Sequence, residues 1–315
     1  MEWFNRYKEQ LGQVYSQAEL SIAQFPEPLR TLGLAYADKH NPVKDHSGKD
    51  YICSLLPFWV KEPSGISDLE CERLALANVY GMLYFFIQDD VMDSQPSSGW
   101  KEQLVLGNLF LLEMYNVFRQ LFPSNSPFWG YYNRYAAVWA ESVTNEDRED
   151  YFVSDPIRTA GKAGPVKIAS TGALLLAGRT DLIEKLERAI EIVLMTLQMA
   201  DDYADWKEDM AEGSYNGLLA MIAAGRSTGE LPLTEKDAEN AIYIRGCMQQ
   251  YVQHASDNHK KLLELDAGMS GLIDFHSFIL DHLNQIRDAL ESNKKALLKG
   301  GLNYFMTNST HLQVQ

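Results

Sequence analysis

Two segments of the sequence repeat an apolar residue every three or four positions and then end in a cluster of aspartates. The first starts near Ser67 and ends in "QDDVMDS", while the second starts after Thr180 and passes through "LQMADDYADWKED" before Gly213. Apolar residues at this spacing form one buried face of a helix. The two segments therefore predict long helices whose buried faces lead directly into carboxylates.

Local signals define the ends of these two helices. Ser67 and Glu70 have the spacing of a capping box, so the first helix is expected to begin there and to run to about Asp93. Thr180 is the expected N-cap of the second helix, and Gly213 is its expected C-terminal stop. Further helices are expected over residues 102–122, 128–143, 235–265 and 271–299, the last ending at Gly300-Gly301.

Strand-like alternation is not evident, and the turn-rich breaks are too short to be interdomain linkers. We therefore expect an all-α fold in a single domain over residues 1–315, arranged as a bundle of largely antiparallel helices. With 315 residues and 46% hydrophobic content the chain can bury a large core.

Composition excludes several classes of protein. A formal net charge of −15 argues against nucleic acid as a partner. No secretory signal and no apolar run of roughly 18 residues is evident, so no transmembrane segment is expected. Three scattered cysteines, Cys53, Cys71 and Cys247, form neither a metal motif nor a disulfide framework, which favours a cytoplasmic location.

Both acidic clusters contain the pattern D-D-x-x-D. Residues four apart share a face of a helix, so Asp89 lies beside Asp93, with Asp90 alongside. In the second cluster, the stacked residues are Asp201, Asp205 and Asp209, with Asp202 next to Asp201. Carboxylates at this spacing repel one another, and a divalent cation removes the repulsion. Mg²⁺ suits such sites because it takes hard oxygen ligands from carboxylates, water and phosphates.

Three other interpretations fit these clusters less well. Each could be a solvated acidic face, but both end an apolar stripe rather than decorate a polar one. A Ca²⁺ loop needs a glycine turn with ligands at alternate positions, and these acids have a helical context. A di-iron bundle needs Glu-x-x-His on two helices, which the sequence lacks. Diphosphate held through Mg²⁺ is the interpretation that remains.

The two motifs resemble those of the class I isoprenoid synthases, which include the trans-prenyl diphosphate synthases and the related bacterial-type terpene synthases. The resemblance covers about Ser47 to Gly213. It implies the class I terpenoid synthase fold, with helices around a central apolar active-site cavity. In this family, aspartate-rich motifs on facing helices hold the diphosphate of an allylic substrate through Mg²⁺.

The resemblance also implies roles for individual residues. The catalytic residues it implies are Asp89, Asp90, Asp93, Asp201, Asp202 and Asp205. The metal ligands it implies are Asp89, Asp90, Asp93, Asp201, Asp205 and Asp209. The metal would be Mg²⁺, about three ions in the closed complex, with Mn²⁺ as an alternative.

Substrate-binding residues are expected near both motifs and between them. The segment "GKAGPVKIASTGALLLAG" resembles the one that carries a diphosphate-binding lysine: Lys162 has the better spacing, Lys167 is the other candidate, and Arg158 is a weaker one. Tyr84 and Phe85 hold the places that limit pocket depth in the family, which points to farnesyl or geranylgeranyl diphosphate. The remaining candidates are Gln88 and Gln198, just upstream of the motifs.

A dry pocket for a carbocation also needs a wall of π surface. The aromatic residues considered for it are Tyr80, Tyr84, Phe85, Trp139 and Trp206. Each of them could instead be ordinary core packing, which is the commoner role of an aromatic residue at helical spacing.

Departures from the chain-elongating members favour a terpene synthase. Those members carry Gly-Lys-Arg for isopentenyl diphosphate, whereas this chain keeps Lys49 but has Asp50 at the arginine position. An arginine pair after the first motif is missing from residues 94–103, and no lysine follows Gly213. The sequence thus predicts ionisation of one allylic prenyl diphosphate, followed by cyclisation or rearrangement of the carbocation and release of diphosphate. A chain-elongating synthase, or a non-catalytic subunit of one, stays as the alternative, and a homodimer is possible.

Overall fold

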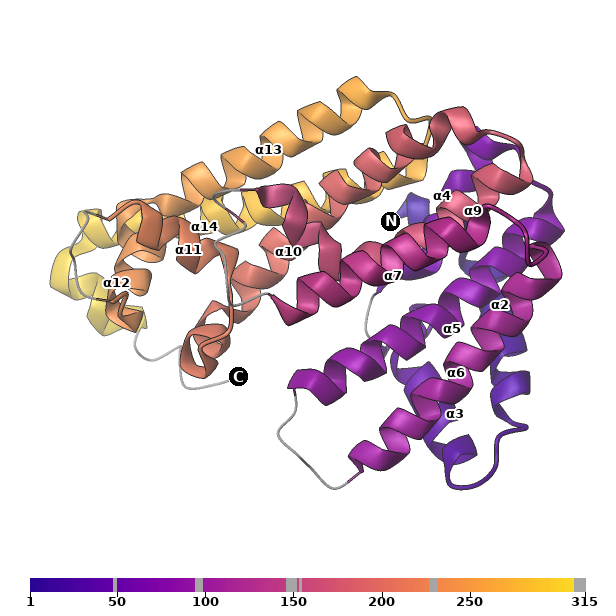
Figure 1. Cartoon of the computed structure of the whole chain (residues 1–315). Helices are drawn as coiled ribbons and strands as arrows, with labels where there is room; N and C mark the ends of the chain where they lie inside the picture. Colours follow the sequence, from indigo (N-terminus) through magenta and orange to yellow (C-terminus); the bar gives the residue numbers. More distant parts are fainter. Residues whose placement is uncertain (48–49, 94–98, 146–151, 153–154, 227–231, 309–315) are drawn as a thin grey trace. The chain divides into compact units, whose positions relative to one another are not determined.

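The computed structural model describes residues 1–47, 50–93, 99–145, 152, 155–226 and 232–308 (Figure 1). Every regular element within these residues is a helix, so the predicted all-α class is confirmed. The chain divides into two compact units. The first contains Met1–Val143, Gly161–Ile190 and Leu265–Asp274, and the second contains Thr144–Ala160, Glu191–Glu264 and Phe275–Gln315. The expectation of one domain over residues 1–315 stays a prediction.

Most helices of the first unit come from the N-terminal half of the chain. They are α1 (Glu2–Asn5), α2 (Lys8–Ile22), α3 (Leu29–Lys39), α4 (Tyr51–Ser64), α5 (Asp68–Asp93), α6 (Trp100–Leu121) and α7 (Phe128–Thr144). The turn η2 (Pro156–Val166) leads into α9 (Lys167–Leu176), and η3 (Thr180–Leu182) follows. Figure 1 shows α5 and α6 side by side, with α2 and α3 packed against this pair.

Two glycines let α5 and α6 approach closely. A Cβ on Gly81 would lie 3.0 Å from the sulfur of Met114, and one on Gly107 would lie 3.2 Å from Ile87 and 3.3 Å from Gln88. The predicted capping box of α5 is confirmed, because the Ser67 N–H donates to Glu70 at 2.9 Å and the Glu70 N–H donates to Ser67 Oγ at 3.3 Å. Helix α5 is therefore fixed at its beginning and along its contact with α6.

Helix α4 lies in the interior of the first unit, although the sequence analysis did not predict it. Every residue from Tyr51 to Val60 is buried, and α4 packs against both α5 and α9. The helix contains Pro57 and Pro63, and proline ordinarily ends or kinks a helix, so the sequence did not indicate a helix here.

The second unit contains most of α10 (Ile183–Glu212), α13 (Cys247–Leu265) and α14 (Ser270–Asn308), together with α11 (Gly217–Ala224), α12 (Glu235–Glu239) and the π-helical turn η4 (Asn240–Arg245). Helix α10 ends just before Gly213, whose φ of 77° is the left-handed conformation expected of a C-terminal stop. Its start differs from the prediction, because Thr180 opens the 3₁₀ turn η3 and the α-helix begins at Ile183.

Two predicted helix boundaries in this unit were wrong. The continuous helix over residues 235–265 is interrupted by η4 and by Gly246, whose φ of 78° is left-handed. The last helix does not end at Gly300-Gly301 but continues to Asn308. A glycine costs about 1 kcal/mol inside a helix, which favours an end without imposing one.

A buried polar network joins three helices of the second unit. Thr196 Oγ1 donates to the Ile192 carbonyl at 3.2 Å and accepts from Asn258 Nδ2 at 3.2 Å. The hydroxyl hydrogen of Thr196 is thus already used. His276 Nε2, which lies 2.9 Å from Thr196 Oγ1, must therefore be the donor of this hydrogen bond. His276 Nδ1 then accepts from His259 Nδ1, which lies 2.9 Å away. Burial, with the nearby His259 adding to it, lowers the pKa of His276 to about 3.

The described cysteines are free, with Cys53 and Cys71 buried and Cys247 half-buried, so no disulfide joins them. Burial raises the pKa of the Cys247 thiol to about 11. Over the described part of the chain, no helix combines the length and apolar character needed to cross a membrane.

The His276 network predicts a loss of stability in acid. A histidine whose folded pKa is lowered from 6.5 to about 3 leaves the folded state short of a proton that the unfolded state binds. Stability is therefore full above pH 6.5 and declines as the pH falls toward 3. Between about pH 7 and pH 5 the expected loss in the free energy of unfolding is on the order of 1–2 kcal/mol.

Urea unfolding of the wild type and of His276→Gln at both pH values measures this loss. The raised pKa of Asp202 makes its own contribution to stability change with pH in the opposite direction over this range. Both proteins contain Asp202, so its contribution cancels when their losses of stability are subtracted. The variant is expected to lose less stability in acid than the wild type. Equal losses would contradict a buried neutral His276.

Candidate active site

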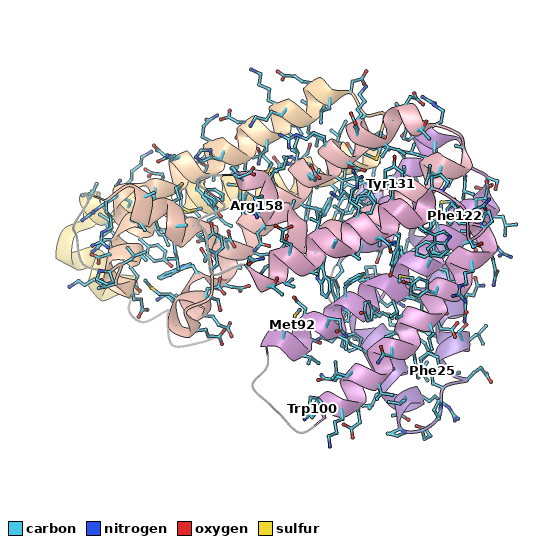
Figure 2. The ribbon with its side chains drawn as sticks, viewed as in Figure 1. Phe25, Met92, Trp100, Phe122, Tyr131 and Arg158 are labelled. Carbon is cyan, nitrogen blue, oxygen red and sulfur yellow. The ribbon has the colours of Figure 1, made fainter. Side chains whose placement is uncertain are left out.

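The first aspartate motif occupies the last turn of α5. Asp89 is exposed, Asp90 is half-buried, and Asp93 is the last residue of the helix, with its side chain outside the described residues. Figure 2 shows Met92 and Trp100 at one end of the α5–α6 pair and Phe122 at the other. The C-terminal end of a helix carries partial negative charge, which makes it an unfavourable place for carboxylates. The motif therefore lies where a cation is most strongly favoured.

Tyr36, on α3, holds the second aspartate of this motif. Its hydroxyl donates to Asp90 Oδ2 at 2.7 Å. Burial and this hydrogen bond raise the pKa of Tyr36, so the phenol stays protonated and remains a donor. Asp90 is thereby fixed in orientation. The sequence offered no sign of this partner, because Tyr36 is far from the motif in the chain.

Aromatic side chains lie directly before the first motif. The Phe85 ring is 4.9 Å from Tyr84 and 5.0 Å from Trp139 of α7, both in edge-on geometry. Tyr84, Phe85 and Gln88 are half-buried. Two other aromatic candidates are core residues, since Tyr80 is 1% exposed and Trp206 is 3% exposed. Of the five, Tyr84, Phe85 and Trp139 form a cluster next to the motif.

The two candidate lysines have different surroundings. Lys167, the first residue of α9, is only 6% exposed, and its Nζ lies 5.1 Å from the centre of the Tyr135 ring. Lys162, in η2, is half-buried. Glycines flank it: a Cβ on Gly161 would collide with Ser142, and one on Gly164 would lie 3.3 Å from the Tyr135 carbonyl. This close approach to α7 sets the position of Lys162.

Arg158 is the third cationic candidate, and it belongs to the second unit, where its side chain is exposed near the start of η2 (Figure 2). Lys49 and residues 94–98, which entered the comparison with chain-elongating enzymes, lie outside the described residues.

The second aspartate motif lies in the C-terminal half of α10. Asp201 and Asp205 are exposed, and Asp209 is half-buried. Asp202 differs from them, with 5% of its surface exposed. The four aspartates thus divide into an accessible group and one buried carboxylate.

Asp202 holds the following helix in place. One of its oxygens accepts from Gln198 Nε2 at 2.9 Å, and the other accepts from the Gly217 N–H at 3.0 Å and from the Tyr251 hydroxyl at 3.5 Å. Burial raises the pKa of Asp202 to about 6, while the bonds from Gln198 and Gly217 oppose that rise. These contacts use the carboxylate for structure, and Gln198 is one of its hydrogen-bond donors.

Asn216 connects the end of the second motif with the start of α11. Its Nδ2 donates to the Asp202 carbonyl at 2.8 Å and to Asp209 Oδ2 at 2.7 Å. Its Oδ1 caps α11 by accepting from the N–H groups of Leu218 and Leu219 at 3.0 and 3.1 Å. The sequence analysis missed this residue, although an asparagine just after a helix-ending glycine is a common N-cap signal.

The donor set of both motifs suits a hard divalent cation. The accessible donors are all carboxylate oxygens, which Mg²⁺ prefers, and water and phosphate oxygens usually complete its shell. Among the side chains that the structure describes, no three acidic, histidine or cysteine residues already converge on one point. The residues available to a metal are therefore Asp89, Asp90, Asp201, Asp205 and Asp209, with Asp93 at the end of α5.

Comparison with solved structures identifies the fold. The chain is similar to a polyprenyl synthase from Caulobacter crescentus CB15, whose structure contains calcium and isoprenyl diphosphate. The TM-score is 0.68 at 17% sequence identity, over 88% of this chain and 96% of that one. No protein-family model and no curated protein matches the sequence. The chain therefore has an isoprenoid-synthase-like fold, as the two motifs predicted.

The division among the aspartates predicts unequal effects on stability. Asp202→Ala leaves the buried Gly217 N–H without its acceptor, so we expect a loss of about 1–3 kcal/mol in the free energy of unfolding. Asp205→Ala, the matched control on the same helix, removes an exposed charge and should change it by no more than about 0.5 kcal/mol. Urea unfolding at pH 7 without metal measures both, and equal effects would contradict the structural role of Asp202.

Proposed function

We propose that this protein is a class I terpene synthase. It ionises an allylic prenyl diphosphate, rearranges or cyclises the resulting carbocation, and releases diphosphate. The observation that carries the proposal is an isoprenoid-synthase-like fold in which two long helices each carry accessible aspartates in their C-terminal halves. The polyprenyl synthase of similar fold contains isoprenyl diphosphate and a divalent cation, which supports a diphosphate as the substrate here.

The accessible aspartates would hold the metal. Asp89, Asp90 and Asp93 on α5, and Asp201, Asp205 and Asp209 on α10, supply the carboxylate oxygens. Bound Mg²⁺ neutralises the charge that develops on a leaving diphosphate. Tyr36 keeps Asp90 in its orientation, while Asp202 and Asn216 stabilise the segment around the second group.

Lys162 is the better candidate for the diphosphate-binding lysine. Its side chain is half-buried, whereas Lys167 is 6% exposed and lies over the Tyr135 ring. A cation on the leaving-group side would add to the charge balance that the metal provides. Tyr84, Phe85 and Trp139 form the apolar π surface near the first motif. With Tyr84 and Phe85 limiting the depth of the pocket, farnesyl or geranylgeranyl diphosphate is the proposed substrate.

Chain elongation remains the second candidate function, and one observation weighs against it. Asp50, where elongating enzymes have an arginine, lies 3.0 Å from His40 Nδ1. A carboxylate at this place repels a second diphosphate, and it offers none of the forked donors with which arginine binds one. A non-catalytic subunit is disfavoured because the accessible aspartates of both motifs are intact.

The metal assignment predicts a large loss of activity. Asp89→Asn removes one ligand oxygen and one charge, so diphosphate release from farnesyl or geranylgeranyl diphosphate should fall by about 10²-fold or more. Asp274→Asn, an exposed aspartate of α14, is the matched control and should retain wild-type rates. Chelation of Mg²⁺ should abolish release in all three proteins, and an Asp89→Asn rate equal to the wild type would rule the assignment out.

The choice between cyclisation and elongation predicts the outcome of adding isopentenyl diphosphate. If Asp50 prevents its binding, the rate and the products should not change. The products should be extractable into hexane without phosphatase treatment and should keep the carbon count of the substrate. Mass spectrometry of the extract checks this. Products that retain diphosphate and gain about five carbons would establish the elongating alternative.

A further inference from the structure

The histidine that follows α3 has one nitrogen held and the other unused. His40 is 9% exposed, and its Nδ1 lies 3.0 Å from Asp50 Oδ2. Its backbone carbonyl accepts from the buried Tyr15 hydroxyl at 2.7 Å, which fixes the position of the residue. Nε2 is buried, and among the described residues no polar atom lies within hydrogen-bond distance of it.

The carboxylate determines which nitrogen carries the hydrogen. Asp50 accepts the hydrogen on Nδ1, so the lone pair of the neutral imidazole remains on Nε2. A proton taken up there gives an imidazolium paired with Asp50. His40 is also the C-cap of α3, where the helix dipole favours a positive charge. The surroundings of His40 therefore support a proton acceptor at Nε2.

Aromatic rings surround the imidazole near the first motif. The His40 ring is 4.8 Å from the ring of Tyr36 and 5.0 Å from that of Phe86. Tyr36 donates to Asp90, and Phe86 precedes Asp90 by one turn on the same face of α5. The imidazole thus contacts the two aromatic residues that adjoin Asp90, one through a hydrogen bond and one through its place on α5, and these rings offer a π surface that suits a carbocation.

An unsatisfied buried nitrogen needs an explanation. Leaving a buried polar atom without a partner costs about 1–3 kcal/mol, so such atoms are uncommon in folded proteins. A histidine kept only for packing would need neither Asp50 nor a bare lone pair. The arrangement is instead that of a base whose partner arrives with the substrate.

We propose that His40 is the base that takes the terminating proton from the carbocation, an inference that rests on the proposed terpene synthase function. A C–H bond next to the cationic carbon breaks, and its electron pair forms the new C=C bond. The proton moves to Nε2, and Asp50 stabilises the imidazolium. The proton then passes to the released diphosphate or to water, which restores the neutral imidazole. Asp50 and Tyr36 are positioning residues.

Product analysis with farnesyl and geranylgeranyl diphosphate tests the assignment, because ionisation and termination are measured separately. Diphosphate release reports ionisation, and the hydrocarbon profile reports termination. In His40→Gln, the fraction of the products that is the main wild-type alkene should fall at least about tenfold. The rate of diphosphate release should fall by less than about threefold. Alcohols or other alkenes should replace it.

Two further variants make the test independent of folding. His46→Gln, an exposed histidine paired with Asp38, is the matched control and should keep the wild-type profile. Asp50→Asn keeps the shape of the pair but removes the charge, and it should shift the profile in the same direction as His40→Gln. If His40→Gln does not fold, the product profile of Asp50→Asn still tests the proposal.

Three outcomes would overturn the proposal in distinguishable ways. An unchanged profile in His40→Gln and Asp50→Asn would show that another group takes the proton. An equal fall in diphosphate release and in every product would indicate a purely structural His40. A wild type that releases no diphosphate from either substrate would remove the proposed function itself, and the base with it.

Discussion

Repulsion among carboxylates at the ends of two helices is the constraint on which the proposed chemistry depends. Helix α5 ends in Asp89, Asp90 and Asp93, where the helix dipole adds to the unfavourable charge. On α10 the exposed Asp201 and Asp205 repeat the pattern. Like charges at this spacing repel one another, and a divalent cation would remove the repulsion. Under the proposed function, stability and metal binding therefore conflict at the same residues.

Polar groups around the motifs limit this conflict. Tyr36 donates to Asp90, and the buried Asp202 takes its donors from Gln198, Gly217 and Tyr251 instead of sharing in the repulsion. Of the two aspartates at the start of D-D-x-x-D on α10, one is thus exposed and the other is structural. Residues of the same type in the same motif thus have different surroundings, and only the exposed one is left for the proposed metal.

Much of this could be predicted from the sequence, because amphipathic helices and paired motifs have local signals. Helix α5 was predicted with its capping box, and the end of α10 with Gly213, whereas α4 was not predicted because it contains Pro57 and Pro63. The metal and substrate roles of the aspartates and lysines stay predictions. The partnerships of Tyr36 with Asp90 and of His40 with Asp50 could not be foreseen, because each depends on where the folded chain brings α3.

The central claim is that the accessible aspartates bind diphosphate only together with a divalent cation. Isothermal titration calorimetry of inorganic diphosphate, with the full chain in excess Mg²⁺ and again in a chelator, measures this directly. The account predicts binding that requires Mg²⁺ and is lost in Asp89→Asn but kept in Asp274→Asn. Binding of equal strength in the chelator, or in Asp89→Asn, would contradict it.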